Sequence, residues 1–152
     1  MEARMKNPGF AVPGAMEGIQ KLVKAIHSTG TDNELLELIA LRASQINGCS
    51  ACVYGHVANL KKAGVGDDRV GNIGAWREAP FYSDAERAAL QLAESMTRQA
   101  DKSSEVVPDE VWDAVTDHFD EGQLSAIILT VALTNMFNRI NATIQEPAGQ
   151  TW

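Results

Sequence analysis

The apolar residues of this chain recur at intervals of three and four along most of its length, and this periodicity is the strongest constraint on its fold. Such spacing places apolar side chains on one face of an α-helix. The alternation of apolar and polar residues that indicates strands is not sustained anywhere, and the Asn47-Gly48 pair lies between helical patterns instead of strand patterns. The sequence therefore predicts an all-α domain of about six or seven helices.

Capping and breaking residues divide the pattern into segments. Capping-box sequences at 31–34 and 83–86 predict two helix starts, and Pro108 suits the first turn of a third helix. The expected helices cover 16–30, 31–46, 50–62, 67–76, 83–99, 108–119 and 124–140. We expect residues 1–14 to form an irregular arm, residues 15–144 to form a single domain, and residues 145–152 to form an irregular tail.

Three segments carry expectations about burial. The helix at 31–46 is apolar almost all round and is therefore expected to be buried, with only Glu37 and Arg42 interrupting it. The helix that follows Pro108 should turn one face inward, made of Val111, Trp112, Val115 and Phe119. The run at 124–140 is expected to be a central core helix or a helix shared with another subunit, in which Trp152 of the tail can also pack.

Composition excludes several classes of function. The 152 residues include thirteen Lys and Arg against twenty Asp and Glu, a net charge of −7. Phosphate backbones and anionic membranes are repelled by such a charge, so neither nucleic acid nor a membrane is an expected partner. The N-terminus lacks an apolar segment of signal-peptide length, and no stretch approaches the roughly 20 apolar residues of a spanning helix. A cytoplasmic location is expected.

The sharpest chemical signal is the segment 47–56, which holds both cysteines and one of three histidines. On a helix, Cys49, Cys52 and His56 fall within roughly 60° of one another. The cysteines lie at the predicted helix start, where backbone N–H groups and the helix dipole favour a thiolate. Cys52 and His56 are four residues apart, a spacing that lets helix side chains share a proton.

These positions suggest a redox site. Cys52 is the candidate nucleophile, because a base, His56, lies one turn away and the N-terminus of the helix lies next to it. Cys49 lies close enough to form a disulfide with an oxidised Cys52. Glu37 shares a helix face with apolar residues, and a partly desolvated carboxyl group there can hold or pass a proton and can orient His56.

Other interpretations of the same residues remain open. The two cysteines and His56 can be ordinary core residues, or they can bind zinc with a water or with His27 or His118 as a fourth ligand. His27 and His118 each lie near a predicted helix end, where a structural role is the simpler interpretation. Glu37 can also form a structural ion pair with Arg42 or another cation.

The segment 37–56 resembles the signature of the alkyl hydroperoxidase D-like branch of the carboxymuconolactone decarboxylase family. The shared pattern is Glu37, an Arg-X-Ser at 42–44, an Asn-X-Cys-X-X-Cys at 47–52 and His56. The likeness extends over about 34–96, and the arm and the last third match only in helical character. Ala51 differs from the best-studied branch, which has a histidine there, and the decarboxylase branch lacks the cysteine pair.

The resemblance implies an all-α fold, a homo-oligomer (trimer or hexamer) and reduction of hydroperoxides by thiols. In the family's mechanism the cysteine at the position of Cys52 attacks the peroxide and the one at Cys49 resolves the product as a disulfide. The residues at Glu37 and His56 relay a proton.

The leading hypothesis is therefore a peroxiredoxin-type peroxidase acting on an organic hydroperoxide or hydrogen peroxide. No cofactor is expected in the chain, and because it lacks a G-x-G-x-x-G motif, electrons must come from an external dithiol or dihydrolipoyl reductant. The alternatives are a carboxymuconolactone decarboxylase-like enzyme for lactones or carboxylic acids, and a non-catalytic redox sensor or zinc-binding module.

Overall fold

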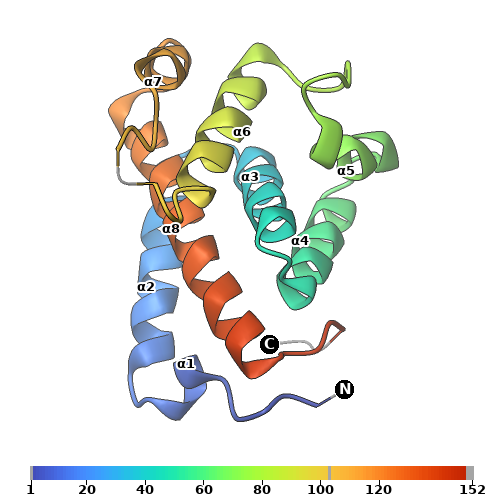
Figure 1. The fold of residues 1–152 in the computed structure, drawn as a ribbon, viewed down its shortest axis with the longest axis vertical. Helices are drawn as coiled ribbons and strands as arrows, with labels where there is room; N and C mark the ends of the chain where they lie inside the picture. The colour runs from blue at the N-terminus through green and yellow to red at the C-terminus, as the bar shows by residue number, and fades with distance from the viewer. Residues whose placement is uncertain (1, 103, 150–152) are drawn as a thin grey trace.

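The computed structural model describes residues 2–102 and 104–149, and this part of the chain contains eight α-helices, one 3-10 helix and no strand (Figure 1). The all-α prediction is confirmed. The elements in chain order are α1 (Pro8–Ala11), α2 (Ala15–His27), α3 (Asn33–Ile46), α4 (Ser50–Lys62), α5 (Asp67–Asn72), η1 (Ile73–Ala75), α6 (Asp84–Thr97), α7 (Asp109–Thr116) and α8 (Glu121–Ile144).

Side-chain caps account for most helix starts. Ser83 and Glu86 form the expected capping box at the start of α6. The capping box expected at 31–34 is wrong, because the cap of α3 is Asp32, whose carboxylate accepts the Glu34 backbone N–H at 3.0 Å. A capping box that was not expected, formed by Asp120 and Gln123, starts α8 ahead of the predicted residue 124.

The N-terminal arm is not irregular throughout, which corrects the expectation for residues 1–14. Asn7 caps the short helix α1, and Pro8 occupies its first turn. The arm lies along the C-terminal end of α8, where the Arg4 backbone N–H donates to the Ile144 carbonyl at 2.7 Å and the Arg4 guanidinium donates to the Thr143 carbonyl at 3.2 Å (Figure 1). The segment around Arg4 is thereby held against the last long helix.

Helix α3 is buried, as its apolar sequence predicted, and it lies at the centre of the molecule. Eight of its fourteen residues are buried, and it packs against α4, α6 and α8 (Figure 1). Burial of this much apolar surface is the main source of stability for a domain of this size. Contacts with three other helices fix the position of α3, and with it the positions of the polar side chains that α3 presents to those helices.

Two tryptophans, Trp112 and Trp152, were expected to pack against other parts of the protein. Trp112 was expected on the inner face of α7 but is 44% exposed, whereas Val111 and Val115 are buried. Helix α7 packs chiefly on α6, so it buries only a narrow face, and residue 112 is turned about 100° away from residue 111. Trp152 lies outside the described residues.

Helix α8 packs on α2, α3, α4 and α6, yet it leaves Leu129 and Met136 exposed. The described part of the tail, through residue 149, is irregular as expected. Of the helices described, none has the length and apolar character needed to cross a membrane.

Candidate active site

The turn between α3 and α4 places the first cysteine. Gly48 has a φ of +67°, a left-handed conformation that glycine adopts without strain, and it ends α3. The Cys49 backbone N–H then donates to the Ser44 carbonyl at 3.0 Å, and Cys49 becomes the N-cap of α4. The two cysteines therefore lie in the first turn of α4, as the sequence predicted.

The two sulfurs form a disulfide, with a Cα–Cα distance of 5.4 Å. The Cys52 backbone N–H donates to Cys49 Sγ at 3.4 Å, which is the helix-capping contact. Cys49 is buried and Cys52 is half-buried. Of the pair, Cys52 is thus the sulfur that a molecule in solution can reach.

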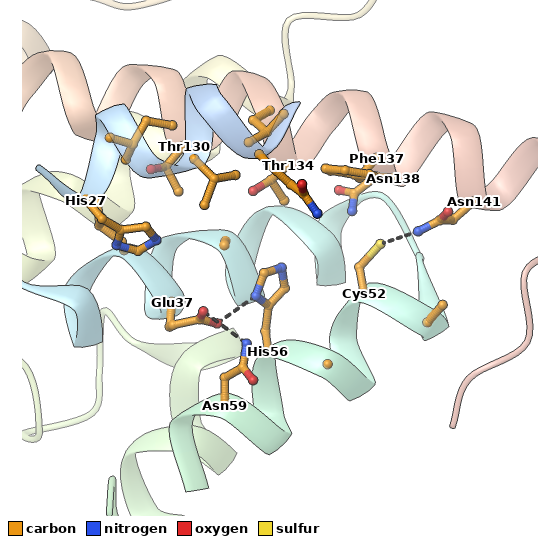
Figure 2. A pocket seen from close by; sticks show the side chains of 18 of the residues that line it. His27, Glu37, Cys52, His56, Asn59, Thr130, Thr134, Phe137, Asn138 and Asn141 are labelled. Atoms are coloured by element: carbon orange, nitrogen blue, oxygen red, sulfur yellow. Dashed lines mark hydrogen bonds and ion pairs between the residues drawn. The ribbon is translucent and has the colours of Figure 1, made fainter. Parts of the chain in front are cut away.

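Glu37 and His56 form a second pair next to the disulfide. His56 Nδ1 lies 2.8 Å from Glu37 Oε2, and Asn59 Nδ2 donates to Glu37 Oε1 at 3.1 Å (Figure 2). The Glu37 and His56 side chains are only 28% and 23% exposed. The ion pair of Glu37 with Arg42 considered from the sequence is wrong, because Arg42 Nε donates to Glu94 at 2.6 Å instead.

A cavity of about 480 Å³ joins these groups and is lined by residues of α2, α3, α4 and α8. Cys52, His56 and Glu37 all face it (Figure 2). Most of the remaining wall is apolar, including Met16, Val23, Ile26, Leu36, Leu133 and Phe137. The cavity can accommodate a small apolar molecule with a reactive group next to Cys52.

Within the described residues, no hydrogen bond joins His56 to Cys52. Their spacing had suggested that these two side chains share a proton directly. Cys52 Sγ instead accepts a hydrogen bond from Asn141 Nδ2 at 3.3 Å (Figure 2). Asn141 is buried on α8 and in turn accepts a hydrogen bond from Asn7 Nδ2 at 3.2 Å. The sequence analysis identified neither asparagine.

A signal for Asn141 was present in the sequence. Polar residues interrupt the apolar run of α8 at Thr130, Thr134, Asn138 and Asn141, and all four line the cavity. Their separations of three and four place them on one face of the helix. A polar stripe in an otherwise apolar helix points to a buried polar surface. Nothing in the sequence, however, indicated that this stripe faces Cys52.

The other two histidines lie at the ends of helices, and His27 also lines the cavity. His27 ends α2, and its Nδ1 lies 2.7 Å from Asn33 Oδ1. His118 follows α7 and contacts the edge of the Phe119 ring. Across residues 2–102 and 104–149, no group of three or more His, Cys, Asp or Glu side chains is arranged to hold a metal ion. The zinc interpretation therefore has no support in the described geometry.

The most strongly perturbed carboxyl group lies away from the cavity. Glu94 on α6 is buried, which raises its pKa, but hydrogen bonds from Arg77, Arg42, Trp76 and Arg98 outweigh burial and lower the pKa to about 2. Its carboxylate accepts from the guanidinium groups of Arg77 at 2.8 Å and of Arg98 at 2.7 Å, and from Trp76 Nε1 at 3.0 Å. This cluster stabilises the fold and carries no group free for chemistry.

Comparison with known proteins gives a family match. The model of the Carboxymuconolactone decarboxylase family matches residues 13–95. The uncharacterized protein YdfG of Bacillus subtilis is 35% identical over 129 residues, which cover 85% of this chain and 86% of that protein. The uncharacterized protein YnjA of Escherichia coli is 27% identical over 117 residues, which cover 77% of this chain and 62% of that protein.

Solved structures share the fold. A protein of unknown function from Agrobacterium tumefaciens, named as a candidate antioxidant defence protein AhpD, matches with a TM-score of 0.87 at 29% identity, covering 99% of this chain and 100% of that one. The debrominase Bmp8 matches with a TM-score of 0.79 at 23% identity, covering 90% of this chain and 72% of that one. At this identity the second likeness bears on the fold alone.

Proposed function

This chain belongs to the carboxymuconolactone decarboxylase family and resembles its alkyl hydroperoxidase D-like members, and from this premise we propose that it is a thiol-dependent, peroxiredoxin-type peroxidase. One observation carries the proposal. The half-buried sulfur of the Cys49–Cys52 disulfide lies in the wall of an apolar cavity that also holds the Glu37–His56 pair. The proposed nucleophile, Cys52, and the proposed proton carrier, His56, thus face one space, and the proposed resolving residue, Cys49, is bonded to Cys52 behind it.

In the oxidative half of the cycle, the Cys52 thiolate attacks one oxygen of the hydroperoxide. The O–O bond breaks, Cys52 becomes a sulfenic acid, and the other oxygen leaves as an alcohol after it takes a proton. His56 supplies this proton from the cavity side while Glu37 holds its Nδ1. Cys49 then attacks the sulfenic sulfur, which forms the disulfide and releases water.

In the reductive half, an external dithiol or dihydrolipoyl group returns two electrons and two protons. Its thiolate attacks the accessible Cys52 sulfur and expels Cys49, whose thiolate is stabilised by the Cys52 backbone N–H at the helix start. The second thiol of the reductant then attacks the mixed disulfide. This step releases Cys52 and leaves the reductant as a disulfide.

The lining of the cavity favours one class of substrate. Side chains such as Leu36, Val23 and Phe137 offer apolar contacts, so an organic hydroperoxide gains binding energy that hydrogen peroxide does not. We therefore expect a higher kcat/KM for cumene hydroperoxide than for hydrogen peroxide.

The test of the proposal is turnover by single-cysteine variants. With a dithiol as reductant, Cys52→Ser should abolish consumption of cumene hydroperoxide. Without added reductant, Cys49→Ser should consume about one equivalent and then stop, because the Cys52 sulfenic acid has no resolving thiol in the protein. Free-thiol counting before and after one equivalent of peroxide measures both outcomes. Full activity of the Cys52→Ser protein would refute the proposal.

A redox sensor is the second candidate, because the same disulfide can regulate assembly without turnover. It predicts a change of oligomeric state on oxidation and no sustained peroxide consumption. A lactone or carboxylic acid enzyme of the family's decarboxylase type would keep its activity after the thiols are blocked. Product analysis on thiol-blocked protein therefore separates it from both redox functions.

We also propose that the chain assembles into a homo-oligomer and is located in the cytoplasm. Leu129 and Met136 on α8 and Phe10 on α1 expose apolar surface, which a homo-oligomer such as a trimer or hexamer would bury. A cytoplasmic, reducing environment would supply the dithiol that completes the cycle. Light scattering on the purified protein measures the subunit number, and a monomer would remove the oligomer from the proposal.

A further inference from the structure

A chain of hydrogen bonds leads from the N-terminal arm to the Cys52 sulfur. The Gly9 backbone N–H donates to Asn7 Oδ1 at 2.9 Å, Asn7 Nδ2 donates to Asn141 Oδ1 at 3.2 Å, and Asn141 Nδ2 donates to Cys52 Sγ at 3.3 Å. Asn7 and Asn141 are 7% and 3% exposed. Two buried amides therefore connect residues that are far apart in sequence.

The direction of this chain is set at its first link. A backbone N–H can only donate, so the atom of Asn7 that faces Gly9 must be the oxygen. The amide nitrogen of Asn7 must then face Asn141, whose oxygen accepts from it. This leaves Asn141 with its nitrogen toward the sulfur, where a reversed amide would lose both contacts.

The sulfur is also the acceptor that this nitrogen needs. Asn141 Nδ2 is buried, and in the part of the chain that the structure describes its hydrogen bond goes to Cys52 Sγ. A buried donor without an acceptor is costly. A thiolate satisfies the amide better than a thiol does, because hydrogen bonds to charged groups are the stronger ones.

We propose that Asn141 is a catalytic residue that stabilises the Cys52 thiolate by donating a hydrogen bond to it, and that Asn7 is the positioning residue that keeps the Asn141 amide in this orientation. Its role in turnover rests on the proposed peroxidase function. The contact acts twice in the cycle, once when Cys52 attacks the peroxide and once when Cys52 leaves the mixed disulfide.

Other groups also act on Cys52, and the test must separate them. The titratable side chains that line the cavity with it are His27 on α2, Glu37 on α3 and His56 on α4, and Cys49 is bonded to it. From α8 the groups facing the cavity are neutral: Thr130, Thr134, Asn138 and Asn141 among the polar ones. Changing Asn141 therefore alters the hydrogen bond without removing a charge.

The experiment measures thiol ionisation without any peroxide. In a Cys49→Ser background, Cys52 is the single thiol, and the rate of its alkylation by iodoacetamide is followed against pH. Asn141→Leu should raise the pH midpoint by about one unit, which lowers the alkylation rate at pH 7 about tenfold. Asn141→Asp, which is nearly isosteric, should raise the midpoint further, because it places an oxygen with negative charge against the sulfur.

The positioning residue has its own variant. Asn7→Asp keeps the acceptor for Gly9 but presents a second oxygen to Asn141, so the Asn141 amide should reverse and the midpoint should rise as in Asn141→Leu. Asn138→Leu is the matched control. It removes a buried amide from the same wall of the cavity, yet Asn138 contacts Ser44 and Asn47 instead of the sulfur, so the midpoint should stay within about 0.2 units.

An unchanged midpoint in Asn141→Leu would overturn the proposal, and so would an equal rise in Asn138→Leu. Unchanged midpoints in Asn141→Asp and Asn7→Asp would also overturn it, because both variants add a negative charge as well as removing the donor. Circular dichroism checks that each variant is folded, and the two aspartate variants keep the test decisive if a leucine variant does not fold. A shifted midpoint without peroxidase turnover would refute the proposed function alone. Turnover with an unchanged midpoint would refute only the role of Asn141.

Discussion

Two carboxylates, Glu37 on α3 and Glu94 on α6, are both held in place by side chains, but by different kinds of partner. Glu94 is bound by Arg42, Arg77 and Arg98, which stay positively charged at any physiological pH. Glu37 is bound by the imidazole of His56 and by the amide of Asn59, neither of which carries a permanent charge.

This difference separates a structural carboxylate, Glu94, from Glu37, the carboxylate that we propose to be functional. The partners of Glu94 hold its pKa at about 2, so it stays ionised and cannot exchange protons. Glu37 lines a cavity and has a partner that can carry a proton to a molecule within it. The size of a pKa shift alone would have selected Glu94, so the identity of the partners is the better guide to function.

The largest expected effect is on stability at the Glu94 cluster. Glu94→Gln leaves the buried position 94 uncharged against the partly buried Arg42, and we expect a loss of roughly 3–5 kcal/mol in the free energy of unfolding. Urea denaturation measures it. Glu78→Gln, an exposed glutamate without an ion pair among the described residues, is the control and should change stability by less than about 0.5 kcal/mol. If Glu94→Gln and Glu78→Gln were equally stable, Glu94 would not have the structural role that distinguishes it from Glu37.

Acid should weaken the same cluster. The pKa of Glu94 is lowered from 4.5 to about 2 in the folded state, so its contribution is fully present above pH 4.5 and is lost as pH falls toward 2. The contribution amounts to roughly 3 kcal/mol. Urea denaturation between pH 2 and pH 6 should show this loss in the parent protein and a smaller one in Glu94→Gln. Identical pH dependence of stability in the parent protein and in Glu94→Gln would contradict this role of the Glu94 carboxylate.

Sequence reasoning was most successful where the relevant residues are close in the chain. Cys49, Cys52 and His56 lie within two turns of one helix, and helical periodicity alone placed them on one side of it. The caps of α6 and the all-α fold were predictable for the same reason, since short-range patterns determine them. The capping box at 31–34 failed because Asp32 competes with Thr31 for the same role, and sequence does not rank such neighbours.

Contacts between distant segments were beyond this reasoning. A contact of Glu37 with His56 was one hypothesis from the sequence and an ion pair of Glu37 with Arg42 was another. The choice between them depends on how α3 is rotated against α4 and α6, which spacing does not show. The contact of Asn141 with Cys52 spans 89 positions and depends on where α8 crosses α4. Tertiary packing decides such contacts, and a single sequence carries little trace of it.

The next effect in size concerns activity at Glu37. Glu37→Gln should lower kcat/KM for cumene hydroperoxide about 100-fold, because a neutral amide cannot exchange a proton with the imidazole of His56. Its free energy of unfolding should change by less than about 1 kcal/mol, since the pair is partly exposed. Peroxide consumption with a dithiol reductant and urea denaturation provide the two measurements. If Glu37→Gln lowered the free energy of unfolding strongly and left the activity unchanged, Glu37 would be a structural carboxylate like Glu94.

The smallest effect is expected at Asn59, which supports Glu37 from the exposed side of α4. Asn59→Ala removes one hydrogen bond to Glu37 Oε1 and should lower kcat/KM only about threefold, because water can replace the amide at an exposed site. Asn59→Asp is the sharper variant. It replaces the donor to Glu37 Oε1 by a second carboxylate, whose repulsion should disturb the Glu37–His56 contact and lower kcat/KM more than Asn59→Ala does. An equal or smaller loss in Asn59→Asp would mean that the position of Glu37 does not matter for turnover.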